Sequence, residues 1–253
     1  MMNFITLLFF NFFIFNLFFS CATKRPLGVT EAEVLLKEAK EMNKAGQYMM
    51  ALERLNHLKT RHPYSYHRAE AELVKADVLF NQENYAEATA TYKVFRDLYP
   101  KHPQTEYVLW KIGESYFRLL PGGFDKDISF AQSAIEYFQK LLTEYPNSQF
   151  KEEASKLLKE CQELLENYEL YVGNFYYKTG EYSAARYRFE KALKKFPSNS
   201  PHLFYMKQKI LQSSVKAKKQ EDCLKDIETY KIELSSWEEY SFLEKQCLHL
   251  AKE

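Results

Sequence analysis

One spacing pattern recurs four times along this chain and constrains its fold more than any other feature. In each copy an alanine is followed by apolar residues four and seven positions later, and by a proline twelve positions later. The copies are Ala51-Leu55-Leu58-Pro63, Ala88-Tyr92-Phe95-Pro100, Ala134-Phe138-Leu141-Pro146 and Ala185-Phe189-Ala192-Pro197. Offsets of four and seven place side chains on one helical face, and a proline beyond the end cannot continue the helix. Each copy therefore predicts a helix with one buried face and a defined stop.

A second helix is predicted in front of each of these helices. Turn signals such as Gly46-Gln47-Tyr48 and Gly180-Glu181-Tyr182 precede the copies, and an amphipathic stretch precedes each turn. A degenerate fifth copy, Cys223-Ile227-Tyr230, lacks the proline, as expected for a terminal repeat. With only 7 Gly and 8 Pro, the chain is poor in the residues that many-turned β folds need.

The predicted fold class is therefore all-α, a solenoid of about five helix-turn-helix repeats. The repeats are expected near residues 30–64, 67–101, 104–147, 148–198 and 201–233, followed by a C-terminal helix at 236–251. Copies start 37, 46, 51 and 38 residues apart, so two insertions are expected. One is a turn-rich loop from Pro121 to Asp127, and the other lengthens a single helix from about Phe150 to Lys178.

The repeat unit resembles the tetratricopeptide repeat. Its fourth copy follows the consensus spacing at Gly173, Tyr176, Ala185, Phe189, Ala192 and Pro197. Glycine inside a helix costs about 1 kcal/mol relative to alanine, so close approach of the paired helix is the expected reason for Gly113 and Gly173. Thr30 and Glu33 form a plausible capping box that opens the first helix.

The first 21 residues differ from the rest of the chain. The run from Phe4 to Phe19 is mostly apolar and uncharged, yet shorter than the roughly 20 residues that span a bilayer, so it is typical of a secretory signal. Ser20-Cys21 resembles the lipobox at which bacterial lipoproteins are cleaved and acylated. We therefore expect a signal peptide at 1–20, a tether at 21–29, a covalent N-acyl diglyceride lipid on Cys21, and no other cofactor.

The charge order around the apolar run leaves a second interpretation open. Met1 to Asn3 carry no Lys or Arg, whereas Lys24 and Arg25 follow the run. This order permits an uncleaved anchor that leaves the helical part in the cytoplasm.

The other cysteines are Cys161, Cys223 and Cys247, an odd number without a close pair. The simplest interpretation makes them small core residues, because free cysteine is among the most buried residue types. A single bridge, for example between Cys223 and Cys247, is the alternative in an oxidising compartment.

Several function classes receive no support. Lys plus Arg (35) nearly balances Asp plus Glu (34), so no overall field attracts nucleic acid. The sequence has no Gly-rich phosphate loop and no nucleophile elbow. His57, His62 and His67 are spaced by five residues, which turns each about 140° from the last on a helix and prevents convergence on one metal. We predict a non-enzymatic protein without a metal site or a nucleic-acid partner.

A stacked array of helix pairs offers a concave groove lined by the first helix of each pair. When the first helix of the third repeat is aligned with the consensus packing positions, the adjoining face of that helix is left unassigned. The first helices of the first two repeats have equivalent faces. The groove residues predicted on these faces are Leu36, Lys40, Asn43, Leu73, Phe80, Tyr107, Trp110 and Phe117. Such a groove suits an extended peptide or a partner helix. The alternative is that Trp110 and Phe117 pack against a neighbouring helix.

Longer motifs resemble the BamD family, also called YfiO or ComL, of outer-membrane assembly lipoproteins. The stretches that carry the resemblance are Asp125-Lys126-Asp127, Ala134 with Phe138-Gln139-Lys140-Leu141-Leu142, Tyr145-Pro146-Asn147-Ser148-Gln149-Phe150, and Asn174 to Phe189. The resemblance covers the lipobox and about five repeats. It implies a lipid-anchored scaffold on the outer membrane that faces the periplasm.

The resemblance also implies partners. The N-terminal repeats would receive unfolded outer-membrane protein segments, and the C-terminal repeats would dock on the barrel-forming core subunit. Arg188 matches the arginine that precedes the phenylalanine in this family, and is implied to pair with a partner carboxylate. Two other classes remain: another envelope lipoprotein, such as a secretin pilotin or cell-envelope coordinator, and a membrane-anchored cytoplasmic co-chaperone.

Overall fold

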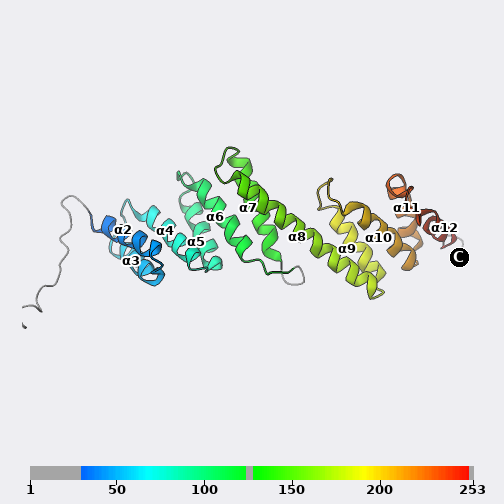
Figure 1. The fold of residues 1–253 in the computed structure, drawn as a ribbon, viewed down its shortest axis with the longest axis horizontal. Helices are drawn as coiled ribbons and strands as arrows, with labels where there is room; N and C mark the ends of the chain where they lie inside the picture. Colours follow the sequence, from blue (N-terminus) through cyan, green and yellow to red (C-terminus); the bar gives the residue numbers. More distant parts are fainter. Residues whose placement is uncertain (1–29, 124–127, 251–253) are drawn as a thin grey trace, which may run out of the picture. The chain divides into compact units, whose positions relative to one another are not determined.

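The computed structural model describes residues 30–123 and 128–250. These residues form eleven α-helices and no β-strand, which confirms the predicted all-α repeat fold (Figure 1). The predicted signal peptide at 1–20, the tether with Cys21, the Asp125-Lys126-Asp127 motif and residue 251 of the predicted last helix lie outside the described residues. The chain divides into two compact units, Met1–Val74 and Lys75–Glu253.

The first unit contains one complete helix pair. Helix α2 (Glu31–Lys44) packs against α3 (Tyr48–Arg61), and α4 (Arg68–Asn81) begins in this unit. Thr30 Oγ1 accepts a hydrogen bond from the Glu33 amide at 3.2 Å, so the predicted N-cap is present. The pair closes on fully buried Ala39, Ala51 and Leu58.

The second unit contains the remaining helices, and helices consecutive in the chain pack against one another. They are α5 (Tyr85–Leu98), α6 (Thr105–Arg118), α7 (Ser129–Glu144), α8 (Lys151–Lys178), α9 (Tyr182–Leu193), α10 (Leu203–Lys216), α11 (Gln220–Leu234) and α12 (Tyr240–Leu250). None of the helices in residues 30–123 and 128–250 is long and apolar enough to cross a membrane.

Proline stops three of the repeat helices in the same way. His62, Tyr99 and Tyr145 each precede a proline and cap their helix in a non-helical backbone conformation. Their amides still donate to the carbonyls four residues back. The residue before a proline is held away from helical geometry by the proline ring. These three helices therefore end just before the prolines, as predicted.

Close packing at glycine explains the two mid-helix glycines. A Cβ built on Gly113 would lie 2.6 Å from Phe138 Cε1, and one on Gly173 would lie 2.6 Å from Phe189 Cε1. Both rings belong to the second helix of the same pair and are fully buried. Glycine is required at these positions because the ring occupies the space of a methyl group.

Helix α8 is the predicted long helix and serves two repeats with its two halves. Ala154 and Cys161 in its N-terminal half belong to the core cluster of α6 and α7. Leu170 and Tyr176 in its C-terminal half pack on the cluster of α9 and α10. Its 28 residues thus connect two hydrophobic cores.

The C-terminal helices carry a covalent link. Cys223 in α11 and Cys247 in α12 form a disulfide with a Cα–Cα distance of 5.6 Å, and Cys161 is free and buried. The bridging alternative therefore holds for one pair, and the core-residue interpretation holds for Cys161. The bridge lies inside the cluster formed by Leu211, Leu234 and their neighbours.

We predict that Gly173→Ala lowers the free energy of unfolding by about 1–3 kcal/mol, because the added methyl overpacks the Phe189 ring. At an open helical site the same change would instead stabilise by about 1 kcal/mol. Urea unfolding followed by circular dichroism measures the difference. Gly122→Ala is the control, since nothing lies within 4 Å of its added Cβ. A stabilised Gly173→Ala variant would contradict the packing explanation.

Candidate partner-binding surfaces

Three predicted groove residues lie in the core instead of on a surface. Leu36 is 4% exposed, Leu73 2% and Trp110 5%. The Trp110 ring stacks on Phe150 with a centroid distance of 5.4 Å and an interplanar angle of 1°. For these three residues the groove prediction is corrected to core packing, the alternative considered for Trp110. Phe150 follows the proline of the third repeat, and its approach could not be derived from helical spacing.

The other predicted groove residues are half-buried and have partners within the chain. Lys40 forms an ion pair with Glu70, and the Phe80 ring is covered by Lys111 Nζ at 3.5 Å. Phe117 packs on the core cluster of α6 and α7, and Asn43 lies near the end of α2. Contact of these residues with a peptide stays a prediction.

Tyr107 is held by Asp77, a half-buried acid of α4 to which the sequence analysis assigned no role. Asp77 Oδ1 accepts hydrogen bonds from Tyr107 Oη at 2.8 Å and from Tyr92 Oη at 2.6 Å. Burial, followed by the charge of Asp77, raises the pKa of both phenols well above the ordinary tyrosine value. Both tyrosines therefore stay protonated and donate, which joins α4, α5 and α6 through one carboxylate.

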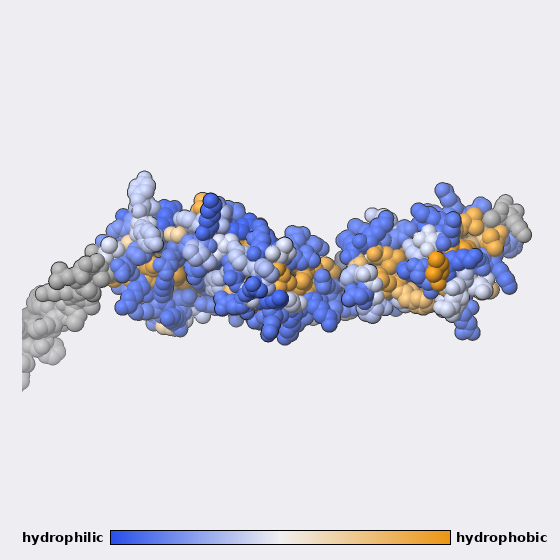
Figure 2. Space-filling view, turned by 90° about the horizontal axis from the view of Figure 1, so that it is seen from above, coloured by the Kyte–Doolittle hydropathy of each residue, from blue (hydrophilic) through white to orange (hydrophobic). Residues whose placement is uncertain are grey.

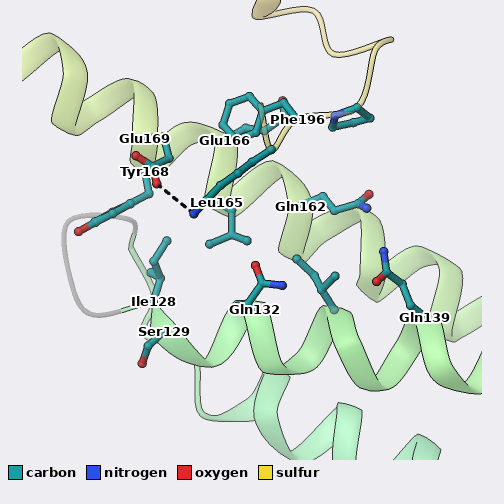
Figure 3. Close-up of a pocket in the computed structure, with 13 residues that line it drawn as sticks. Ile128, Ser129, Gln132, Gln139, Gln162, Leu165, Glu166, Tyr168, Glu169 and Phe196 are labelled. Atoms are coloured by element: carbon teal, nitrogen blue, oxygen red, sulfur yellow. Dashed lines mark ion pairs between the residues drawn. The ribbon is translucent and has the colours of Figure 1, made fainter. Parts of the chain in front are cut away.

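A cleft of about 650 Å³ lies where α8 passes from one core to the next. Figure 3 shows Gln132 and Gln139 of α7 facing Gln162 and Leu165 of α8 across it. Lys195, Phe196 and Pro197, from the segment between α9 and α10, close one side. Glutamine side chains can form hydrogen bonds with the backbone of an extended peptide, and the apolar wall can contact its side chains. The cleft therefore suits a peptide segment.

Two buried carboxylates of α8 lie at this cleft. Glu166 is 6% exposed and accepts a hydrogen bond from Ser200 Oγ at 2.7 Å. Glu169 is 8% exposed, with Lys195 Nζ 4.0 Å from Oε1 and Arg188 Nη1 3.6 Å from Oε2. Oε2 is buried and accepts no hydrogen bond from any residue that the structure describes. A buried carboxylate oxygen favours a further donor, so this end of the cleft suits a basic or N–H group.

Arg188, predicted to pair with a partner carboxylate, is half-buried in this structure. Its guanidinium lies 3.6 Å from Glu169, so its immediate acid is in the chain itself. Pairing with a partner stays a prediction, and it would require sharing or exchange of this contact.

The more deeply placed arginine of α9 is Arg186, which the sequence interpretation missed. Its Nε and Nη2 both donate to Asp226 of α11 at 2.7 Å, and its Nε also donates to Ser214 of α10 at 3.0 Å. Glu190 and Asp222 lie at its outer edge, at 3.1 and 3.3 Å. The hydrogen bonds with Asp226, foremost, raise the pKa of Arg186 above its ordinary value.

A sequence signal for this pair existed. Arg186 follows the small residue Ala185 of the fourth copy, and Asp226 precedes Ile227 of the fifth. Opposite charges beside the buried faces of consecutive repeats can meet between them. Which pair meets depends on helix rotation, which spacing does not specify.

Aromatic side chains are exposed on the C-terminal part of α8 and on α9 and α10. The exposed members are Tyr171, Phe175, Tyr187, Phe204 and Tyr205. Lys209 Nζ lies 4.2 Å from the centre of the Tyr177 ring, and Lys216 Nζ lies 4.8 Å from the same ring. Figure 2 shows apolar surface over α9 and α10 on the face that it presents. Aromatic side chains are enriched at protein-binding surfaces, so this face suits a protein partner.

The helix pairs, the glycine sites filled by phenyl rings and the proline stops define a tetratricopeptide-type repeat protein. The family model described as YfiO, outer membrane lipoprotein, matches residues 30–224. The chain belongs to this family.

Curated relatives are named as outer membrane protein assembly factors. The outer membrane protein assembly factor BamD of Neisseria meningitidis serogroup A is 27% identical over 170 residues, covering 64% of this chain and 64% of that protein. The BamD of Vibrio cholerae is 26% identical over 172 residues, covering 64% of this chain and 71% of that protein. The chain thus spans slightly less than two thirds of the meningococcal relative.

Solved repeat domains are more distant. The TPR2AB domain of yeast Sti1, solved as a complex with pHSP90, gives a TM-score of 0.43 at 15% identity. The match covers 87% of this chain and 84% of that one. The P58(IPK) TPR domain gives 0.44 at 14% identity, with 88% and 66% covered.

We predict that Arg186→Met lowers the free energy of unfolding by about 3–5 kcal/mol, because it leaves the carboxylate of Asp226 buried without its cation. Lys191→Met is the matched control, a basic residue on the exposed face of the same helix. The measurement is urea unfolding followed by circular dichroism. Equal stability of the two variants would show that the buried pair contributes nothing beyond a surface charge.

Proposed function

We propose that this protein is a non-enzymatic, lipid-anchored scaffold of the machinery that assembles β-barrel proteins in the outer membrane. The family match over residues 30–224 is the observation that carries the proposal. Its relatives are named as outer membrane protein assembly factors. A repeat array suits this role because stacked helix pairs expose extended surfaces to several partners.

The disulfide supports a location outside the cytoplasm. Disulfides form and persist in oxidising compartments such as the bacterial periplasm and are rare in the cytosol. Cys223 and Cys247 are bridged, and both are fully buried. This pair favours the exported, periplasm-facing protein over a membrane-anchored cytoplasmic co-chaperone.

The described surfaces suggest how two partners would bind. The N-terminal repeats would receive unfolded outer-membrane protein segments, with the half-buried groove residues Phe80 and Phe117 of the second unit as contacts. The barrel-forming core subunit would dock on the C-terminal repeats, near the cleft and the exposed aromatic residues of α8 to α10. Arg188 and Glu169 offer both signs of charge at that cleft.

We predict that radiolabelled palmitate enters the wild-type protein, and that Cys21→Ala abolishes the label, because the acylated cysteine carries the lipid. Cys161→Ala is the control, since that thiol is buried in the core cluster and should leave labelling unchanged. An unlabelled wild-type chain of full length would instead support the uncleaved anchor.

We predict that Arg188→Glu reduces recovery of the barrel-forming core subunit from detergent-solubilised envelopes by about tenfold or more. Loss of one member of a buried charge pair in an interface costs roughly 2–5 kcal/mol. The control is Lys191→Glu, the same charge reversal on the exposed face of α9. Unchanged recovery with Arg188→Glu would reject this docking residue, whereas recovery of a secretin by the wild-type protein would reject the assembly function itself.

A further inference from the structure

The loop between α3 and α4 holds two tyrosines almost entirely in water. Tyr64 is 99% exposed and Tyr66 is 96% exposed. The loop at residues 62–67, here called the tyrosine loop, is nonetheless an ordered turn. Ser65 N donates to the His62 carbonyl at 3.1 Å, and Arg68 Nη1 donates to the Pro63 carbonyl at 3.0 Å. The backbone thus presents both rings outward.

The turn itself does not require aromatic residues. The same backbone turn follows α5 and α7, where His102 N donates to Tyr99 O and Ser148 N donates to Tyr145 O, each at 3.0 Å. The positions equivalent to Tyr64 and Tyr66 are exposed there too. They are occupied by Lys101 and Pro103 in one loop and by Asn147 and Gln149 in the other. Only the first of these three loops presents two phenol rings to solvent.

The tyrosine loop lies at the end of the first repeat where the tether joins it. Glu31, the first residue of α2, lies 3.6 Å from Arg61 Nη1 and 3.6 Å from His62 Nε2. The nine steps from Cys21 to Thr30 reach at most about 30 Å, because one residue spans roughly 3.3–3.6 Å. Helix α3 has 14 residues, so its N-terminal end lies about 21 Å from the end that leads into the tyrosine loop.

The residues around the loop suit a phospholipid surface. The segment 57–68 contains Lys59, Arg61 and Arg68 and no Asp or Glu. Lys59 pairs with Glu72 at 3.3 Å and Arg61 with Glu31 at 3.6 Å, yet the side chains of both basic residues are more than half exposed. Basic residues are attracted to anionic headgroups. Tyrosine is enriched at membrane interfaces because its ring is apolar and its hydroxyl is polar.

We propose that the tyrosine loop is a second membrane contact, in which Tyr64 and Tyr66 insert among the headgroups of the phospholipid leaflet that holds the Cys21 lipid. This inference rests on the lipid anchor proposed above. A lipid on Cys21 alone holds the first repeat at one point, about which it can rotate. The loop supplies a second point and so restricts that rotation.

The test uses the full lipidated protein in vesicles of phosphatidylethanolamine and phosphatidylglycerol, with an environment-sensitive nitrobenzoxadiazole label on Tyr64→Cys. The native cysteines interfere little, because Cys21 is acylated and Cys223 is bridged to Cys247. Burial raises the pKa of the Cys161 thiol to about 12, so it stays protonated and unreactive. Met49→Cys is the matched label site, 71% exposed and in the first turn of α3 at the opposite end.

The expected result is a several-fold brighter label at position 64 than at position 49, with quenching by doxyl groups carried on the lipid. Adding Tyr66→Gln, the residue type of the loop after α7, should reduce the brightening without disturbing the turn. Circular dichroism checks that each variant is folded.

Other outcomes separate the loop from the anchor. Protein that floats with the vesicles but carries a dim label at position 64, or equally bright labels at both positions, overturns the loop contact alone. Protein that does not float overturns the anchor, and the loop contact with it. A label that brightens in native envelopes but not in lipid vesicles assigns the loop to a protein partner and also overturns the proposal.

Discussion

The insertion of a phenyl ring into the space left by a glycine is the contact on which the pairing of helices depends. Phe138 fills the site of Gly113, and Phe189 fills that of Gly173. The first two repeats have Ala39 and Ala76, both fully buried, sixteen residues before Leu55 and Tyr92, the spacing that separates Gly173 from Phe189. A small residue in the first helix thus sets how closely the second can approach. Dense packing makes the interface sensitive to a single methyl group.

Helix α8 belongs to two helix pairs and lines the cleft described above. Its two halves belong to different cores, and its middle residues line this cleft. The cleft forms there, with glutamines on its walls and the carboxylates of Glu166 and Glu169 at one end. Buried carboxylates cost free energy unless they are paired, so Ser200, Arg188 and Lys195 are held near them. Among the described residues, none donates a hydrogen bond to Glu169 Oε2.

The C-terminal repeats are held together by different means. Arg186 and Asp226 form a buried pair across α9, α10 and α11, and the Cys223–Cys247 disulfide joins α11 to α12. A disulfide restricts the unfolded chain, and a buried ion pair penalises the loss of either partner. Together they restrain helices α9 to α12 relative to one another. The remaining exposed aromatic residues of α8 to α10 are then available to a partner.

The spacing of small, apolar and proline residues was enough to predict the helices, the long α8 and the need for close approach at Gly113 and Gly173. The helices and their ends are local features, because helical period, capping and proline sterics act within a few residues. A glycine inside a helix indicates that another helix approaches closely, without specifying which side chain fills the space. The stacking of Trp110 on Phe150, the choice of Arg186 over Arg188 as the buried arginine, and the cleft beside Glu169 depend on how helices rotate and cross. Only the tertiary structure decided them, since side chains far apart in sequence meet according to packing geometry that no spacing along the chain encodes.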